Sequence, residues 1–148
     1  MIARIVISKS DEETLEIGRE IGRGLDGGEM ILLRGGLGVG KTLLTKGILD
    51  GLGFDYDEVT SPSFTLVNLY PTEKFNVYHI DLWRLEGPNP DKAVALDEIL
   101  SDEKAVVIIE WSERLTPFPS GRKTIQIEIS GDGDDERRFE FSELPEGR

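Results

Sequence analysis

Apolar positions along this chain follow two periods, which predict a succession of helices and strands. Between residues 15 and 25 they recur every three or four positions, as on one face of a helix. Elsewhere they alternate with polar residues or run on unbroken, as in strands. The elements we expect are, in chain order, a strand at 2–7, a helix from the Ser10 to Glu13 capping box to about 26–28, a strand at 29–34, a helix from 41 to about 52, strands at 64–70 and 75–83, a helix at 91–100, and strands at 105–110, 123–129 and 137–141.

Two patterns indicate how these strands are arranged in a sheet. The run 105–110 is apolar without alternation, which is typical of a central strand covered on both faces. A turn at 71–74 and a polar segment at 131–135 each separate two strands closely enough for an antiparallel hairpin. We therefore expect an α/β fold with a mixed sheet, flanking helices and added antiparallel hairpins, in a single domain that spans residues 1–148.

The segment between the second strand and the second helix has the spacing of a phosphate-binding P-loop. It consists of Gly35, four further residues, and Gly-Lys-Thr at 40–42. Glycines let backbone N–H groups curl around a polyphosphate, and the helix that follows adds the positive end of its dipole. Lys41 is expected to neutralise the β- and γ-phosphates of ATP, and the Thr42 hydroxyl to bind Mg²⁺. The residues expected to contact ATP or ADP are Gly36, Leu37, Gly38, Val39, Gly40, Lys41, Thr42 and Leu43.

Two carboxylates in strands are candidates for metal binding and catalysis. Glu110 ends the apolar run 105–110, which is the place of a Walker B carboxylate that holds Mg²⁺ or its water. Asp81 lies among apolar strand residues, where a carboxylate is costly unless a charge or a metal compensates it. His79 shares a strand face with Asp81, and we interpret it as hydrogen-bonded packing rather than as a chemical group. The expected catalytic residues are Lys41, Asp81 and Glu110, and the sequence leaves open which carboxylate touches Mg²⁺.

Hydroxyl side chains gather between residues 60 and 65. Pro62 disfavours a helix at Ser61, so we expect a structured loop that leads into the next strand. In P-loop proteins a segment at this place often senses the γ-phosphate. The candidate switch residues are Thr60, Ser61 and Thr65, and a turn capped by the same hydroxyls is the alternative.

Composition limits the cell compartment and the partners. The chain has no cysteine, which excludes a disulfide framework and a cysteine-based metal or nucleophile site. No apolar run approaches the length of a membrane span, and the first residues do not have the pattern of a signal peptide, so we expect a cytoplasmic protein. Seventeen basic and twenty-nine acidic side chains give a net charge of −12, which repels phosphate backbones at long range. Any nucleic-acid role is therefore expected to run through a partner.

Four motifs now stand in one order along the chain: Gly-x4-Gly-Lys-Thr at 35–42, Thr-Ser-Pro-Ser-Phe-Thr-Leu at 60–66, His-Ile-Asp-Leu-Trp-Arg-Leu at 79–85 and Ile-Ile-Glu-Trp at 108–111. Together they resemble the bacterial TsaE (YjeE-like) family of small P-loop ATPases. The resemblance implies a P-loop NTPase-like mixed sheet and a role in the threonylcarbamoyladenosine (t6A) modification of tRNA. It also implies two protein partners, TsaB and TsaD, whose complex is reset between turnovers by a weak, Mg²⁺-dependent and partner-activated ATPase cycle, so that tRNA is reached only indirectly.

The same resemblance assigns roles by position. Asp81 would be a second acidic group at the metal or the attacking water, beside Glu110, and Trp111 would lie next to the nucleotide. The hydroxyl-rich segment at 60–65 would respond to the nucleotide. No motif marks the adenine pocket, for which Glu13 and Thr14, at the start of the first helix, are the candidates.

Two positions depart from the family pattern. Gly36 stands where the family usually has aspartate, and Leu43 stands where a second threonine is common. Neither change removes a phosphate ligand, but Gly36 loosens the loop and makes the local charge less negative. We expect the departures to affect nucleotide affinity and rate rather than the kind of function.

Two other functions remain as alternatives to a partner-dependent ATPase. One is a nucleotide-gated assembly switch in which binding rather than hydrolysis matters. The other is a small-molecule kinase, although its usual arginine-bearing lid has only the scattered candidates Arg84, Arg114 and Arg122. A GTPase is disfavoured because residues 89–92 lack the Asn-Lys-x-Asp order that reads guanine.

Overall fold

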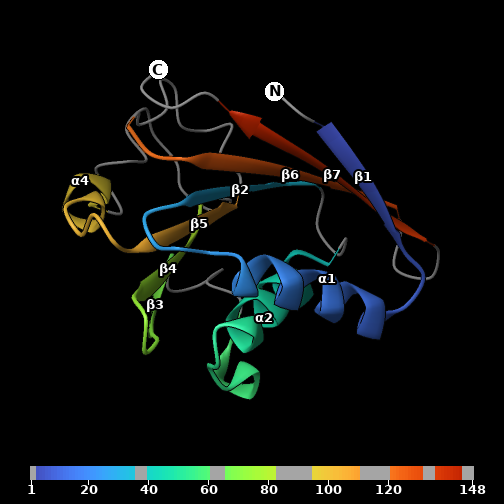
Figure 1. The fold of residues 1–148 in the computed structure, drawn as a ribbon, viewed down its shortest axis with the longest axis horizontal. Helices are drawn as coiled ribbons and strands as arrows, with labels where there is room; N and C mark the ends of the chain where they lie inside the picture. Colours follow the sequence, from blue (N-terminus) through green and yellow to red (C-terminus); the bar gives the residue numbers. More distant parts are fainter. Residues whose placement is uncertain are drawn as a thin grey trace.

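The computed structural model describes residues 3–35, 40–60, 66–82, 95–110, 121–131 and 136–144. None of the helices in these ranges is both long enough and apolar enough to span a lipid bilayer. The elements are, in chain order, β1 (Ala3–Ser8), α1 (Asp11–Arg23), β2 (Met30–Arg34), α2 (Lys41–Gly51), a 3-10 turn (Tyr56–Glu58), β3 (Val67–Pro71), β4 (Asn76–Asp81), α4 (Leu96–Leu100), β5 (Val106–Glu110), β6 (Thr124–Ser130) and β7 (Arg137–Leu144) (Figure 1).

The strands of the described ranges form one mixed sheet in the order β1-β7-β6-β2-β5-β4-β3. The inner strands β6, β2, β5 and β4 run parallel to one another. At the two sides, β3 pairs with β4, β7 with β6, and β1 with β7, all antiparallel. The predicted α/β fold and both predicted hairpins are therefore confirmed.

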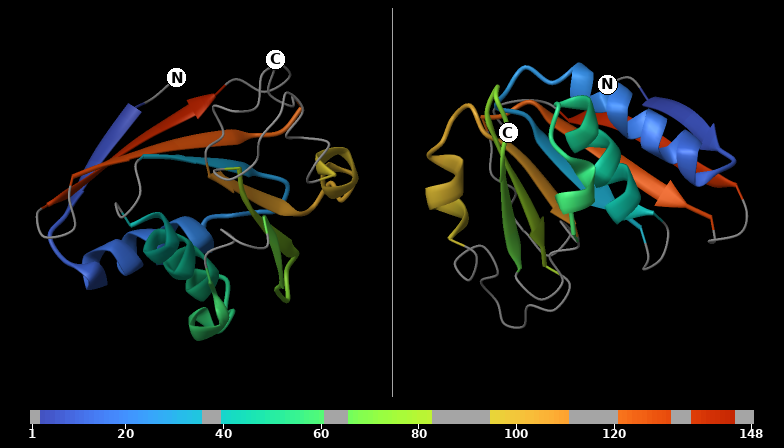
Figure 2. Two further views of the ribbon diagram at one scale, coloured as in Figure 1. Left: turned by 180° about the vertical axis from the view of Figure 1, so that it is seen from behind. Right: turned by 90° about the horizontal axis from the view of Figure 1, so that it is seen from below.

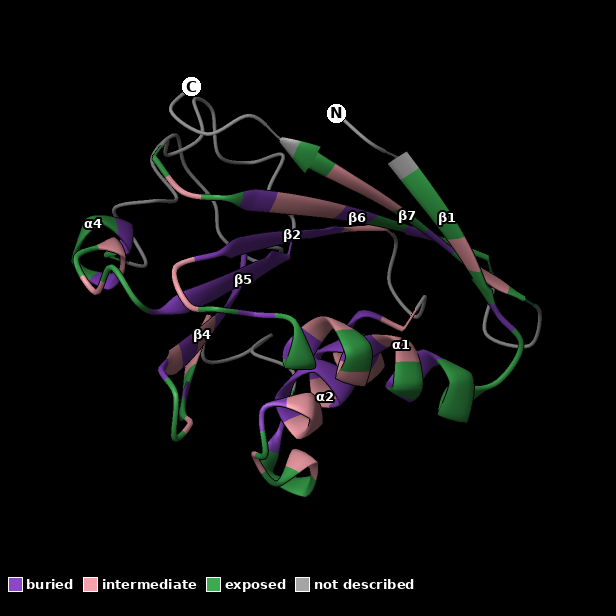
Figure 3. Ribbon diagram, in the orientation of Figure 1, coloured by how far each residue is buried: buried purple, intermediate pink, exposed green. Residues whose placement is uncertain are grey.

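The centre of the sheet is covered on both faces. Every residue of β5 is buried, as the unbroken apolar run predicted, and β2 is buried from Met30 to Leu33 (Figure 3). Ile31 belongs to an apolar cluster that includes α2 side chains, whereas Leu32 belongs to a second cluster that includes α4 side chains. Accordingly α1 and α2 lie together against one face and α4 lies on the other (Figure 2).

Helices α1 and α2 pack backbone against backbone through glycine. A Cβ added at Gly18 would lie 2.5 Å from the carbonyl oxygen of Leu44, and one added at Gly22 would lie 2.1 Å from that of Ile48. Gly47 of α2 approaches the carbonyl oxygen of Leu15 in the same way, at 2.4 Å. Contacts this short leave no room for a side chain, so the glycines set the distance between the two helices. Because α2 starts at the P-loop lysine, this packing also positions the candidate site.

The first helix begins as predicted but ends earlier. The Glu13 amide donates to Ser10 Oγ at 3.1 Å, which confirms the Ser10 half of the capping box, and Glu13 Oε1 accepts from the Lys9 amide at 2.8 Å, one residue before the cap. The helix stops at Arg23 rather than near residues 26–28. The reason is Glu29, whose buried carboxylate accepts from the amides of residues 26 and 27, both at 2.8 Å, and thereby holds them in a turn.

Two other predicted boundaries are wrong, each because of one residue in the left-handed backbone region. Leu66 has a φ of 68°, so the strand predicted at 64–70 begins only at Val67. Ala95 has a φ of 53°, so the helix predicted at 91–100 cannot run through it, and α4 comprises only residues 96–100. Residues 61–65 and 83–94 lie outside the described ranges.

Arg122 connects the amino ends of two parallel strands to the end of α4. Its guanidinium donates to the carbonyl oxygens of Ala105 at 2.6 Å, Asp102 at 2.8 Å, Leu100 at 3.0 Å and Gly28 at 3.4 Å. Burial lowers the pKa of Arg122, against the raising effect of nearby carboxylates. The side chain therefore acts as a structural clamp at the edge of the sheet opposite to the phosphate loop.

Candidate functional site

The candidate site lies where the parallel strands end. The carboxyl end of β2 leads to Gly35, β5 ends at Glu110, and β4 ends at Asp81. Asp81 and Glu110 are directly paired in the register of β4 and β5, and both are 4% exposed. Ligands of open α/β sheets bind at this edge, outside the carboxyl ends of the strands. The fold therefore brings the two predicted carboxylates together beside the phosphate loop.

Both described ends of the phosphate loop require glycine. Gly35 has a φ of 148° and Gly40 a φ of 102°, a region that side chains rarely allow. Gly40 is also the residue immediately before α2, and no acidic side chain occupies the first turn of this helix, in contrast to the three in α1. The amides of Thr42 and Leu43 have no acceptor within the helix and can bind an anion. Residues 36–39 lie outside the described ranges.

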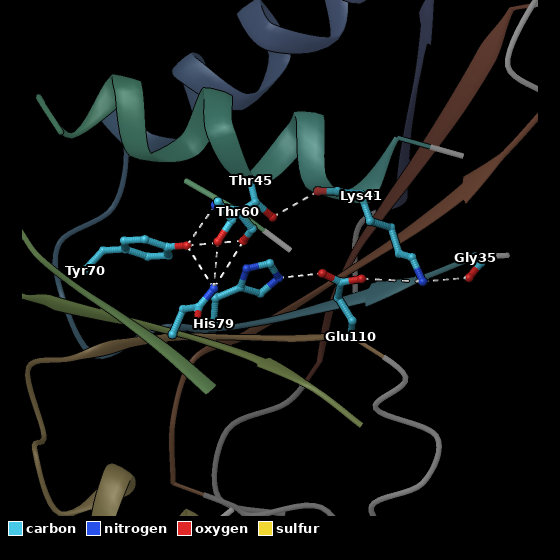
Figure 4. A network of polar contacts seen from close by, with 8 residues as sticks. Gly35, Lys41, Thr45, Thr60, Tyr70, His79 and Glu110 are labelled. Carbon is cyan, nitrogen blue, oxygen red and sulfur yellow. Dashed lines mark hydrogen bonds and ion pairs between the residues drawn. The ribbon is translucent and has the colours of Figure 1, made fainter. Parts of the chain in front are cut away.

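Lys41 is buried and aimed at the carboxylate of β5. Its Nζ donates to the carbonyl oxygen of Gly35 at 3.1 Å and lies 3.6 Å from Glu110 Oε1 (Figure 4). Thr45, fully buried one turn later, donates its hydroxyl to the Lys41 carbonyl oxygen at 2.9 Å. The lysine is thus held next to a carboxylate at the place where a phosphate would arrive.

Each of the two carboxylate oxygens of Glu110 contacts a different side chain. Its Oε2 lies 2.5 Å from Nε2 of His79, and its Oε1 faces Lys41 (Figure 4). Burial by itself would raise the pKa of Glu110, but the hydrogen bond from His79, together with the charges of His79 and Lys41, outweighs burial and lowers that pKa. The carboxylate is therefore kept ionised. His79 is buried and hydrogen-bonded, as expected, but the sequence did not show that its partner is the catalytic candidate.

The predicted switch segment is described only at its first residue. Thr60 is exposed, its amide donates to the Tyr70 hydroxyl at 3.1 Å, and its carbonyl oxygen accepts from that hydroxyl at 3.2 Å. Asn68 Nδ2 donates to the same hydroxyl at 3.1 Å and to the Thr60 carbonyl oxygen at 3.2 Å. The segment therefore starts from an anchor on β3. The switch candidates Ser61 and Thr65 lie outside the described ranges.

The start of α1, the candidate adenine pocket, lies close to the phosphate loop. The Thr14 hydroxyl is buried, 2.7 Å from Ser8 Oγ, and accepts from Arg137 Nη1 at 3.4 Å. The same nitrogen binds Asp11 at 3.0 Å, while a Cβ added at Gly40 would lie 3.4 Å from Cδ of Arg137. Glu13 instead serves the capping box. Trp111, also predicted beside the nucleotide, lies outside the described ranges.

Arg137 is not among the site residues predicted from the sequence. Its Nε is buried without a hydrogen-bond partner among the described residues, and the side chain joins α1 to the end of the phosphate loop. A signal was present, because alternation in β7 puts residue 137 on the same face as the buried Phe139. A cation at an inward position indicates a specific partner.

The donors at this edge of the sheet fit Mg²⁺. The described ranges hold no group of three or more metal-binding side chains of the His, Cys, Asp or Glu type. Mg²⁺ does not need one, because it usually keeps several waters and takes one or two carboxylates together with phosphate oxygens. Asp81 and Glu110 at adjacent strand ends, with the Thr42 hydroxyl at the start of α2, supply oxygen ligands of that kind.

Comparison with known proteins agrees with this geometry. The family model "Threonylcarbamoyl adenosine biosynthesis protein TsaE" matches residues 8–139. The tRNA threonylcarbamoyladenosine biosynthesis protein TsaE of Nostoc sp. is 37% identical over 127 residues, which cover 82% of this chain and 76% of that protein. The Aquifex aeolicus protein of the same name is 40% identical over 113 residues, covering 76% and 79% respectively. The crystal structure of YdiB from Bacillus subtilis superposes with a TM-score of 0.72 at 29% identity, covering 97% of this chain and 87% of that one.

Proposed function

This chain belongs to the TsaE family of threonylcarbamoyl adenosine biosynthesis proteins, and from that premise we propose that it is a Mg²⁺-dependent ATPase serving the t6A modification of tRNA. The observation that carries the proposal is the convergence of Lys41, Asp81 and Glu110 at the carboxyl edge of the sheet. A phosphate loop alone supports only the binding of a nucleoside triphosphate. Two buried carboxylates beside it support hydrolysis.

Different residues are proposed to bind the phosphates, hold the metal and orient the attacking water. Amides at the start of α2 bind the phosphates, and Lys41 exchanges its contact with Glu110 for the β- and γ-phosphates, where it stabilises the charge that develops during transfer to water. Thr42 and one carboxylate would hold Mg²⁺, which would neutralise phosphate charge when bound. The other carboxylate orients the attacking water. We propose that the base lies near the start of α1, where Arg137 connects that helix to the end of the phosphate loop.

The partners follow from the family rather than from a surface of this chain. We propose that the protein acts on a complex of TsaB and TsaD and resets it between turnovers. The net charge of −12 supports this indirect role, because an acidic protein is repelled by tRNA at long range.

The test is ATP turnover with purified TsaB and TsaD present. Lys41→Ala should lower kcat by at least about 100-fold, because it removes the cation that stabilises transferring charge. Lys46→Ala is the matched control, since Lys46 lies on the same helix but has no place in the site. Equal turnover by wild type and Lys41→Ala would refute the ATPase.

The two alternative functions, a nucleotide-gated switch and a small-molecule kinase, differ from the ATPase in observable ways. A nucleotide-gated switch, which the Lys41–Glu110 contact also permits, would support many rounds of tRNA modification with a non-hydrolysable ATP analogue, whereas the ATPase would support only one. A small-molecule kinase is disfavoured further, because Arg122, one of its candidate lid arginines, is engaged by backbone carbonyls at the opposite edge of the sheet.

A further inference from the structure

His79, the only histidine of the chain, lies in the middle of β4 and is completely buried. Its neighbours in the register are Asn68 on β3 and Ile108 on β5. Strand alternation gives it the same face as Asp81, two residues further on. The ring is therefore built into the sheet directly below the two carboxylates, and it takes no direct part in the proposed chemistry.

The ring makes one polar contact and lacks another. Nε2 lies 2.5 Å from Glu110 Oε2, and only a hydrogen on Nε2 makes this a bond to a carboxylate (Figure 4). Nδ1 is buried and has no hydrogen-bond partner among the described residues. An unpaired buried nitrogen is unfavourable, so an aliphatic side chain would serve packing alone better. The histidine is thus explained by its bond to Glu110.

That bond decides the orientation of the carboxylate. With Oε2 taken by His79, Oε1 is the oxygen turned toward Lys41 Nζ, 3.6 Å away. Without the His79 bond, Glu110 would be held by Lys41 alone and would lose this contact when the phosphates attract the lysine. Glu110 would then be free to rotate at the moment when its position matters.

We propose that His79 is a positioning residue, whose Nε2–H keeps Glu110 in place after Lys41 has turned to the nucleotide. This rests on the proposed ATPase, because it gives Glu110 a part in hydrolysis. It predicts that the loss of the donor slows the chemical step and weakens Mg²⁺ binding, without weakening the binding of nucleotide in the absence of metal.

The first experiment needs neither nucleotide nor metal. Because the chain has one histidine, a ¹⁵N spectrum of the imidazole contains the signals of a single ring. We expect a proton on Nε2 that exchanges slowly with water and shifts in Glu110→Gln. A proton on Nδ1 with none on Nε2, or a ring in fast exchange with water, would overturn the proposal even if the protein hydrolyses ATP.

The second experiment compares two amide replacements of His79 that differ in how far the side-chain nitrogen reaches. In His79→Gln the amide nitrogen ends about where Nε2 lies, whereas in His79→Asn it ends near Nδ1 and falls short of Glu110. We expect His79→Asn to lower kcat and to raise the half-saturating Mg²⁺ concentration by about 10-fold or more, with an unchanged KM for ATP, while His79→Gln stays within about 3-fold of wild type. ADP binding without Mg²⁺ should be equal in all three proteins.

Equal losses in the two variants, or losses that follow thermal stability, would show that the ring only fills space. If neither variant folds, the imidazole spectrum of the wild type alone tests whether His79 donates from Nε2 to Glu110. If the wild type does not hydrolyse ATP, the ATPase fails, and the imidazole spectrum still reports whether His79 holds Glu110.

Discussion

Gly22→Ala tests whether α2, which begins at the phosphate loop, touches α1 backbone to backbone. The added Cβ would lie 2.1 Å from the Ile48 carbonyl oxygen, whereas such atoms essentially never come closer than 3.0 Å. The helices would have to move apart by close to 0.9 Å, the difference between these distances. No flexible side chain can yield instead, because the atoms opposed to the Cβ belong to the α2 backbone, at Ile48 and Gly51.

Two effects of opposite sign set the magnitude. Alanine favours the helix over glycine by about 1 kcal/mol at most. Overpacking costs about 1–3 kcal/mol, and the upper value applies where both opposed atoms are backbone. We expect Gly22→Ala to lower the free energy of unfolding by about 2 kcal/mol, which for a chain of this length lowers Tm by about 4–8 °C.

The assay is thermal and urea unfolding of the nucleotide-free protein, followed by circular dichroism. Gly24→Ala is the matched control, because Gly24 caps the same helix with a φ of −89° and its nearest neighbours would be 3.6 Å or more from an added Cβ. The control should remain within about 0.5 kcal/mol of wild type. If Gly22→Ala were as stable as the control or more stable than wild type, helix propensity alone would be at work and the backbone contact would be refuted.

Two further predictions concern the supports of the fold and of the switch segment. Arg122→Met should lower the free energy of unfolding by about 3 kcal/mol, because it leaves several carbonyl oxygens without their charged donor, and a loss below about 0.5 kcal/mol in urea unfolding would contradict the clamp. Tyr70→Phe should cost about 1 kcal/mol and speed hydrogen exchange at the Thr60 amide, whose acceptor is the Tyr70 hydroxyl, whereas Tyr78→Phe should leave that exchange unchanged.

Local patterns predicted most of the elements, because each depends on neighbours along the chain. The glycine spacing of the phosphate loop, the unbroken apolar run before Glu110 and the capping box from Ser10 to Glu13 each correspond to a feature of the structure. Two boundaries were wrong where a non-glycine residue, Leu66 or Ala95, takes a left-handed conformation. Such a residue is stabilised by its surroundings rather than by its own preference, so its sequence carries no signal.

The site itself was predicted only as a set of residue types, and the tertiary structure decided which of them meet. Asp81 and Glu110 are neighbours because β4 and β5 pair in parallel at one register, and that register also brings His79 to Glu110 across 31 positions of sequence. Arg137 reaches the phosphate loop because β7 follows the sheet back past α1. Periodicity states which face a side chain takes, but not which strand lies beside it, because strand order arises from burying the whole sheet at once.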